Sequence, residues 1–294
     1  MDTFIDPGKT VLVTGAGGQL GKALQKSAAQ YPAYHFLFET KENFPIDNFA
    51  VVKKYFSRHR IDYCINCAAY TAVDTAETDS EKAFSINGDA VGNLAKVCKD
   101  HQALLIHIST DYVFDGTATQ PYKEEDAIAP VNMYGASKLK GEELALNSNQ
   151  LSVIIRTSWL YSSENKNFVK TMLRLMSERE SVNVVSDQYG CPTYAPDLAA
   201  VIMKIIEKEN EAPGSDYGIF NYCNTGITTW YDFAEAIKEI VKSECKIIPV
   251  PTTSFPTPAK RPGYSVLDTS KIQQLLGVTI PFWKDSLKKM FNEI

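Results

Sequence analysis

The stretch Thr10-Val11-Leu12-Val13-Thr14-Gly15-Ala16-Gly17-Gly18-Gln19-Leu20-Gly21 joins a short apolar segment to a glycine-rich turn. The apolar residues predict a buried strand, and the residues from Leu20 to Ala29 predict an amphipathic helix. Gly15, Gly18 and Gly21 stand three residues apart, where the backbone can turn tightly and approach a pyrophosphate closely. The start of the helix adds free N–H groups that favour an anion. The stretch therefore predicts a dinucleotide cradle.

Strand and helix patterns alternate through the first half of the sequence. Further strands are predicted at 34–38, 61–66, 103–109 and 152–156, and helices at 49–58, 77–100 and 134–147. Helices of this length between strands imply crossover connections and a parallel sheet that is covered on both faces. We therefore predict an α/β fold with a doubly wound, Rossmann-like parallel sheet.

The pattern is less regular beyond residue 158. Helices are predicted at 167–180 and 196–207 and a strand at 218–222; a proline-rich tract follows at 249–262. Such a tract rarely lies in a central sheet, because proline has no N–H to donate. We expect residues 1–157 and 195–224 to form the dinucleotide-binding domain. Residues 158–194 and 225–294 are expected to form a smaller substrate-binding lobe, mostly C-terminal, that closes over the carboxyl edge of the sheet.

The composition is ordinary for a globular protein and argues against several classes. The formal net charge of −5 disfavours non-specific binding to nucleic acid. No apolar run approaches the roughly 20 residues that span a bilayer. The acidic start Met1-Asp2-Thr3 lacks the features of a signal peptide. We therefore expect no nucleic-acid partner, no membrane and a cytoplasmic location.

The cysteines and histidines show no spacing typical of a metal site. Cys64 and Cys67 form a C-x-x-C pair, which could indicate redox chemistry or zinc. They lie in a predicted strand, however, where residues three apart point to opposite faces. We expect two buried thiols and no metal.

Tyr134 and Lys138 are four residues apart on a predicted helix and therefore share a face. Free tyrosine has a pKa of about 10. A nearby ammonium, helped by an oxidised nicotinamide, is expected to lower that pKa and make Tyr134 a usable proton donor. Thr110 ends a predicted strand, and its hydroxyl can hold a substrate oxygen in line with Tyr134. Lys138 can also bind the nicotinamide ribose. A Y-x-x-x-K pair is common by chance, so this interpretation depends on the preceding strand and glycine turn.

Glu39 follows the second predicted strand, where a dinucleotide fold places the carboxylate that binds a ribose hydroxyl. A carboxylate there repels a 2′-phosphate and favours NADH. Lys41 lies close enough to favour NADPH instead, so either cofactor is compatible with the sequence. Ala68 and Ala69 end the third strand, where small side chains would let the adenosine ribose lie against the backbone.

Two residues are candidates for contacts with a substrate. Trp159 follows the strand at 152–156 and could stack on a sugar or lie in the core. Arg261 lies in the proline-rich tract and could bind a diphosphate or remain a surface charge. The sequence leaves both alternatives open.

Several blocks resemble the extended short-chain dehydrogenase/reductase superfamily and, within it, the dTDP-4-dehydrorhamnose reductase family. They include Thr110-Asp111-Tyr112-Val113-Phe114-Asp115-Gly116, the residues from Tyr134 to Glu142, and segments 156–161, 167–172, 187–193 and 256–262. The resemblance runs from Thr10 to nearly the end of the chain. It implies hydride transfer from NADH or NADPH to C4 of dTDP-4-dehydro-L-rhamnose. The product, dTDP-L-rhamnose, would serve surface polysaccharide synthesis.

The resemblance also implies roles by position. Tyr134 would be the proton donor with Lys138 as its partner, and Thr110 would orient the substrate beside Asp111. Trp159 would contact the sugar nucleotide. The cofactor would lie against Gly15, Gly18, Gln19, Leu20, Gly21, Glu39, Asp47, Ala68, Ala69 and Tyr70. Some members of the family are magnesium-linked dimers, but Asp197 offers no clear match to their glutamates, so a homodimer stays open without a metal bridge.

Two other functions are compatible with a dinucleotide cradle. One is a non-catalytic regulatory subunit of the methionine adenosyltransferase type, which binds a dinucleotide without turning it over. The intact set of Thr110, Tyr134 and Lys138 argues against it, because a binding module needs no tuned phenol. The other is a different nucleotide-sugar reductase or an epimerase, which would keep its NAD tightly bound.

Overall fold

The computed structural model describes residues 8–214 and 217–293. Its centre is a six-stranded parallel sheet in the order β10-β5-β4-β3-β1-β2. The strands are β1 (Lys9–Thr14), β2 (Tyr34–Glu39), β3 (Tyr63–Asn66), β4 (Leu104–Thr110), β5 (Ser152–Thr157) and β10 (Gly218–Asn221). From β1 the chain moves to the edge at β2 and then returns to β3 on the other side of β1. This is the doubly wound, Rossmann-like sheet that the sequence predicts.

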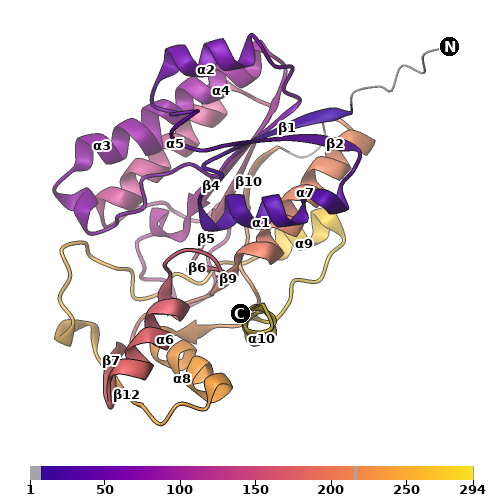
Figure 1. Cartoon of the computed structure of the whole chain (residues 1–294). Helices are drawn as coiled ribbons and strands as arrows, with labels where there is room; N and C mark the ends of the chain where they lie inside the picture. Colours follow the sequence, from indigo (N-terminus) through magenta and orange to yellow (C-terminus); the bar gives the residue numbers. More distant parts are fainter. Residues whose placement is uncertain (1–7, 215–216, 294) are drawn as a thin grey trace.

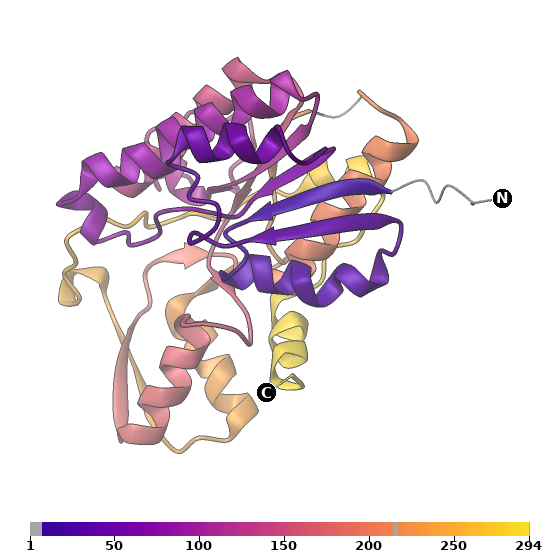
Figure 2. The same ribbon diagram turned by 45° about the horizontal axis from the view of Figure 1, so that its top comes forward.

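Helices cover both faces of this sheet (Figures 1 and 2). On one face lie α2 (Phe49–Phe56), α3 (Ser80–Phe84), α4 (Ala90–Asp100) and α5 (Met133–Ser148). On the other lie α1 (Gln19–Ser27), α7 (Ala195–Glu211) and α9 (Ser270–Leu276). A π-helical turn, Ser85–Asp89, separates α3 from α4, so the structure divides the helix predicted at 77–100 into two pieces. Short 3₁₀ helices lie at Ala28–Gln30, Thr75–Glu77, Asp111–Val113 and Thr252–Ser254.

Two apolar clusters hold these layers together. Val11 and Val13 of β1 belong to the cluster on the α1 and α7 side, whereas Leu12 belongs to the cluster on the α2 and α4 side. All three side chains are fully buried. Successive side chains of a strand point to opposite faces, so a continuous apolar run is what a strand covered on both sides requires. Within 8–214 and 217–293, no helix is long and apolar enough to cross a membrane.

A smaller group of elements lies below the sheet in Figure 1, formed by α6 (Phe168–Glu178), α8 (Trp230–Val241) and the strands β7 (Ser181–Val185) and β12 (Lys246–Val250). With α10 (Trp283–Phe291) they surround a third apolar cluster. β7 pairs with β12, β6 (Leu160–Tyr161) with β9 (Thr193–Tyr194), and β8 (Tyr189–Gly190) with β11 (Thr228–Thr229). Pro249 lies in β12, which pairs only with β7. The proline-rich tract is therefore outside the central sheet, as the sequence predicts.

The segment after β12 returns to the sheet. The backbone carbonyl of Lys260 accepts a hydrogen bond from Asn132 Nδ2 at 2.8 Å. The Arg261 guanidinium donates to both carboxylate oxygens of Asp74, each at 2.9 Å. Because Asn132 precedes α5, these contacts fix the return segment beside the start of that helix.

Candidate active site

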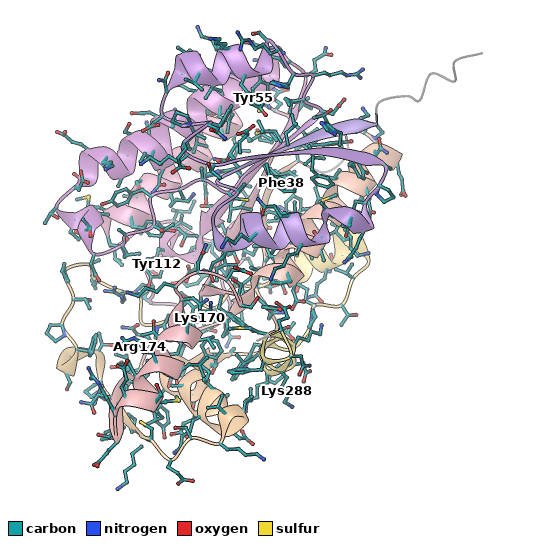
Figure 3. All side chains as sticks on the ribbon, in the orientation of Figure 1. Phe38, Tyr55, Tyr112, Lys170, Arg174 and Lys288 are labelled. Atoms are coloured by element: carbon teal, nitrogen blue, oxygen red, sulfur yellow. The ribbon has the colours of Figure 1, made fainter. Side chains whose placement is uncertain are left out.

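A cavity of about 880 Å³ lies at the carboxyl edge of the sheet. The glycine turn after β1, the loop after β3, the end of β4, the start of α5 and the segment after β5 form its wall. Tyr112, one of the lining residues, lies where the sheet meets the smaller group of elements (Figure 3). Open α/β sheets bind ligands where the strand order reverses, which here is between β1 and β3. The cavity has the size and place of a cofactor site.

Most of the predicted site residues line this cavity; Glu39 and Arg261 are the two that do not. Those in the wall are Gly15, Gly18, Gln19, Leu20, Gly21, Asp47, Ala68, Ala69, Tyr70, Thr110, Asp111, Tyr134, Lys138 and Trp159.

The glycine turn is shaped by close approaches of backbone to backbone. Gly15 has a φ of +62°, and a Cβ on it would lie 2.6 Å from the Ala68 nitrogen. A Cβ on Gly21 would lie 2.5 Å from Ala16 Cα. Any larger residue would push the turn away from the end of β3 or push α1 away from the turn. The first residues of α1 line the cavity, so their free N–H groups are available to a pyrophosphate.

The Gln19 side chain does not reach toward such a ligand. Its Nε2 donates to the Leu160 carbonyl at 3.2 Å, and its Oε1 accepts from Asn167 Nδ2 at 2.9 Å. Gln19 thus ties the glycine turn to the segment that leads into α6. Only its backbone N–H is free to contribute to the predicted anion site.

Glu39 is engaged with another residue. Its carboxylate accepts a hydrogen bond at 2.8 Å from the hydroxyl of Tyr55, which Figure 3 labels on α2. Lys41, two residues further on, does line the cavity. On the side of the cavity where the sequence predicts a carboxylate that binds the ribose, the wall therefore contains Lys41 and not Glu39.

Tyr134 and Lys138 lie side by side at the base of the cavity. Asn132 precedes α5, and its Oδ1 accepts from the Gly135 N–H at 2.8 Å, which fixes the start of the helix. One turn later, Lys138 Nζ donates to the Ile108 carbonyl at 2.6 Å. Tyr134 is hydrogen-bonded to Thr110 at the end of β4. The structure therefore brings together the three residues that the sequence assigns to the chemistry.

The pKa values of these residues differ from the sequence-based expectation. Burial, and to a smaller extent the Asp111 carboxylate, raise the pKa of Tyr134 to about 12, against the opposing effect of the hydrogen bond with Thr110. Burial lowers the pKa of Lys138 to about 8, against the effect of Glu142. Lys138 is not among the groups that shift the Tyr134 pKa here, and the lowering predicted for an ammonium together with an oxidised nicotinamide stays a prediction. The raised pKa keeps the phenol protonated at neutral pH, which is the form that can donate a proton.

Asp111 adds a second titratable group to the wall. It is 2% exposed, and its Oδ1 accepts from Thr110 Oγ1 at 3.0 Å. Burial raises its pKa to about 7, while hydrogen bonds from Ser265 and Thr110 oppose the rise. A carboxyl group beside Thr110 therefore changes charge close to neutral pH.

Trp159 lies in the cavity wall and also packs against the third apolar cluster. It has a φ of +45° and stacks on Trp230, with ring centroids 3.6 Å apart and planes at 11°. Both rings line the cavity. Trp230 begins α8, far away in the sequence, and no local pattern singles it out.

Arg261 is half-buried outside the cavity, and its guanidinium is held by Asp74. Tyr112 is close enough for the arginine charge to act on its pKa. Two other cations, Lys82 and Lys166, line the cavity directly. Sequence reasoning missed both, because an isolated lysine carries no motif.

Cys67 departs from its predicted burial. Cys64 is fully buried, but Cys67 is half-buried and lines the cavity. β3 ends at Asn66, so the alternation of a strand does not extend to Cys67. In the part of the chain that the structure describes, no group of three or more His, Cys, Asp and Glu side chains could hold a metal ion.

Comparisons with known proteins agree with this architecture. Residues 9–294 match the family model described as RmlD substrate binding domain. The dTDP-4-dehydrorhamnose reductase of Aggregatibacter actinomycetemcomitans is 40% identical over 286 residues, which cover 95% of this chain and 97% of the relative. The spore coat polysaccharide biosynthesis protein SpsK of Bacillus subtilis is also 40% identical, over 96% of this chain and 97% of its own.

Solved structures support the same family assignment. The dTDP-4-dehydrorhamnose reductase of Bacillus anthracis, in complex with NADP, superposes with a TM-score of 0.93 at 38% identity, covering 98% of this chain and 100% of that one. The Clostridium acetobutylicum reductase has a TM-score of 0.91 at 39% identity, covering 97% and 99%. The chain belongs to the dTDP-4-dehydrorhamnose reductase family.

Proposed function

We propose that this protein is an NAD(P)H-dependent oxidoreductase that reduces the C4 keto group of dTDP-4-dehydro-L-rhamnose. The product is dTDP-L-rhamnose, for surface polysaccharide synthesis. One observation carries the proposal: Thr110, Tyr134 and Lys138 line the same cavity as the glycine turn. A regulatory subunit that only binds a dinucleotide has no use for this set.

The residues present fit a nicotinamide dinucleotide. The turn at Gly15 and Gly21 is so close to the backbone of Ala68 and Ala16 that no Cβ is tolerated, and the first residues of α1, which keep free N–H groups, line the cavity. Ala68, Ala69 and Tyr70 form the adenosine side. Asp47 is exposed at the rim, and Lys41 suits a 2′-phosphate. When bound, the reduced cofactor supplies the hydride.

The chain's own residues supply the proton and its control. Tyr134 Oη gives its proton to the carbonyl oxygen as the carbonyl carbon is reduced, and it is left as a phenolate. A charged Lys138 stabilises that phenolate, and solvent returns the proton after the product leaves. Thr110 holds the carbonyl oxygen in line with the phenol. Asp111 works best here when it is protonated, because its charge makes Tyr134 a weaker acid.

The sugar nucleotide is assigned to the smaller lobe, predicted at residues 158–194 and 225–294, although α9 within the second range packs on the central sheet. The Trp159–Trp230 stack gives this lobe a flat aromatic wall for the sugar or base. Arg261 is the candidate cation for the substrate diphosphate, and binding would then require it to leave Asp74. We place the protein in the cytoplasm, since all six cysteines are free thiols, as is usual in a reducing compartment.

The test is a reaction of pure protein with NADPH and dTDP-4-dehydro-L-rhamnose. We expect loss of NADPH absorbance and one equivalent of dTDP-L-rhamnose for each NADP⁺ released. Binding of NADPH without its consumption would support the regulatory alternative. Conversion of the sugar with no net release of oxidised cofactor would indicate an epimerase.

A further inference from the structure

A chain of buried polar side chains runs beneath the cavity from β1 to α5. Thr14, Asn66, His107 and Lys138 are each at most 1% exposed. Thr14 Oγ1 donates to Asn66 Oδ1 at 2.6 Å, and Asn66 Nδ2 lies 3.0 Å from His107 Nδ1. His107 Nε2 lies 3.2 Å from Lys138 Nζ. Three adjacent strands thus connect to the lysine that faces the cofactor cavity.

The backbone of Ala68 fixes the direction of these hydrogen bonds. Its N–H donates to Asn66 Oδ1 at 3.3 Å. A peptide N–H can only donate, so the amide oxygen faces Ala68 and Thr14, and the amide nitrogen faces His107. An amide nitrogen also only donates, so His107 Nδ1 must accept. Burial and the lysine charge hold the pKa of His107 well below its usual value. The ring is therefore neutral, and its one hydrogen is on Nε2, facing Lys138.

This arrangement matches only one charge state of the lysine. An Nε2–H needs an acceptor, and a neutral amine has a lone pair, whereas an ammonium has none. A charged Lys138 requires the opposite arrangement, in which Nε2 accepts from the lysine and Nδ1 carries the hydrogen. The Asn66 amide must then turn over to accept from Nδ1, and it gives up the Ala68 N–H. The His–Lys pair gains one proton in this change.

We infer that His107 is a positioning residue that couples the charge of Lys138 to the orientation of the Asn66 amide. Because Ala68 lines the cofactor cavity, the same change alters a hydrogen bond of the cavity wall. Other titratable groups act on the lysine: Glu142 on α5 and Cys67 after β3. Glu142 is in turn paired with Arg156 of β5. These groups help to set the pH at which Lys138 changes charge, and His107 sets which hydrogen bonds accompany each state.

Nitrogen NMR of protein labelled with ¹⁵N-histidine reports the tautomer directly, and His107→Gln identifies the His107 signals by their loss. We expect a neutral ring with its hydrogen on Nε2 above the Lys138 pKa of about 8 and on Nδ1 below it. A ring that keeps one tautomer throughout overturns the inference. In the Lys138→Met control, which has no titrating amine, the hydrogen should stay on Nε2 at every pH. A change of tautomer in that variant also overturns the coupling.

The second test uses His107→Phe, which keeps a ring but removes both nitrogens. We expect kcat to fall about tenfold or more, because a charged lysine loses a hydrogen-bond acceptor. The alkaline limb of the pH profile of kcat should move to lower pH, with little change in KM. A purely structural role would lower the melting temperature and leave the profile in place, which would overturn the positioning role. The kinetic test rests on the proposed function of Lys138, whereas the NMR test does not. A failure of the proposed function can therefore be told apart from a failure of the coupling between His107 and Lys138.

Discussion

The central sheet and the smaller group of elements around α6 and α8 bury different chemistry. Around α5 the interior holds Lys138, Glu142 and Arg156, all at most 1% exposed. The interior of the smaller group of elements is apolar and includes aromatic rings, with Phe233 and Trp283 packed edge to face at 5.5 Å. A buried charge costs free energy unless it is paired and hydrogen-bonded, whereas packed rings stabilise directly. The comparison indicates that the sheet region gives up stability to bury charged groups, one of which, Lys138, lines the cavity, and that the smaller group of elements supplies shape.

The largest effect should come from removing one oxygen atom at the cavity. Tyr134→Phe leaves the ring and its packing in place but removes the proton that the carbonyl needs. We expect kcat to fall about 10²–10⁴-fold. The dissociation constant for NADPH, measured by fluorescence titration, should stay within about twofold of the wild type, because the Tyr134 hydroxyl is expected to act on the substrate carbonyl. Near-normal turnover in a variant with an unchanged melting temperature would remove Tyr134 from the mechanism.

The buried ion pair should be the most sensitive point of the interior. Glu142 binds Arg156 Nη2 at 2.7 Å and Nε at 3.0 Å, and it accepts from Ser109 Oγ at 2.5 Å. Glu142→Gln leaves an uncompensated buried arginine, so we expect a loss of about 3–5 kcal/mol in the free energy of unfolding. Phe233→Leu, fully buried in the lobe, should lose only about 1–2 kcal/mol. Urea unfolding measures both, and equal losses would contradict the contrast between the regions.

The sequence predicted what local patterns encode. The run from Val11 to Val13 reads as a strand buried on both faces, and the glycine spacing gives the turn and the start of α1, because both signals lie within a few residues. Tyr134 and Lys138 are one helical turn apart, so their common face follows from the period of the helix. These parts of the fold and site needed no long-range information.

The rest depends on partners that are distant in sequence. Glu39 fits its predicted position, yet Tyr55 of α2 binds its carboxylate; Asp74 engages Arg261 in the same way. Each partner could be found only from the packed structure. The raised pKa of Tyr134 likewise comes from burial, which a four-residue spacing does not report.

A smaller effect, of opposite sign, should come from Lys138→Met. The folded pKa of about 8 lies below the usual 10.5, so the unfolded chain binds more protons between these values. Stability therefore rises with pH across this window, and the full cost of burying the charge applies below about pH 8. We expect the variant to be more stable than the wild type at pH 7, by up to about 3 kcal/mol. The gain should shrink toward pH 10.5, and a gain independent of pH would show that the lysine pKa is not lowered.

The smallest effect should come from an exposed charge of the sheet region. Lys41 is exposed at the cavity rim, where water screens its attraction for a 2′-phosphate. A contact of this kind contributes up to about 1 kcal/mol. Lys41→Ala should therefore weaken the binding of NADPH by up to about fivefold and leave the binding of NADH unchanged.

Tyr55→Phe tests the same cofactor preference through the opposite charge. It frees the Glu39 carboxylate, which should then repel the 2′-phosphate and favour NADH. Titrating the Lys41→Ala and Tyr55→Phe variants with both cofactors measures the change in each affinity. Equal losses of affinity for NADH and NADPH would place the 2′-phosphate away from this rim.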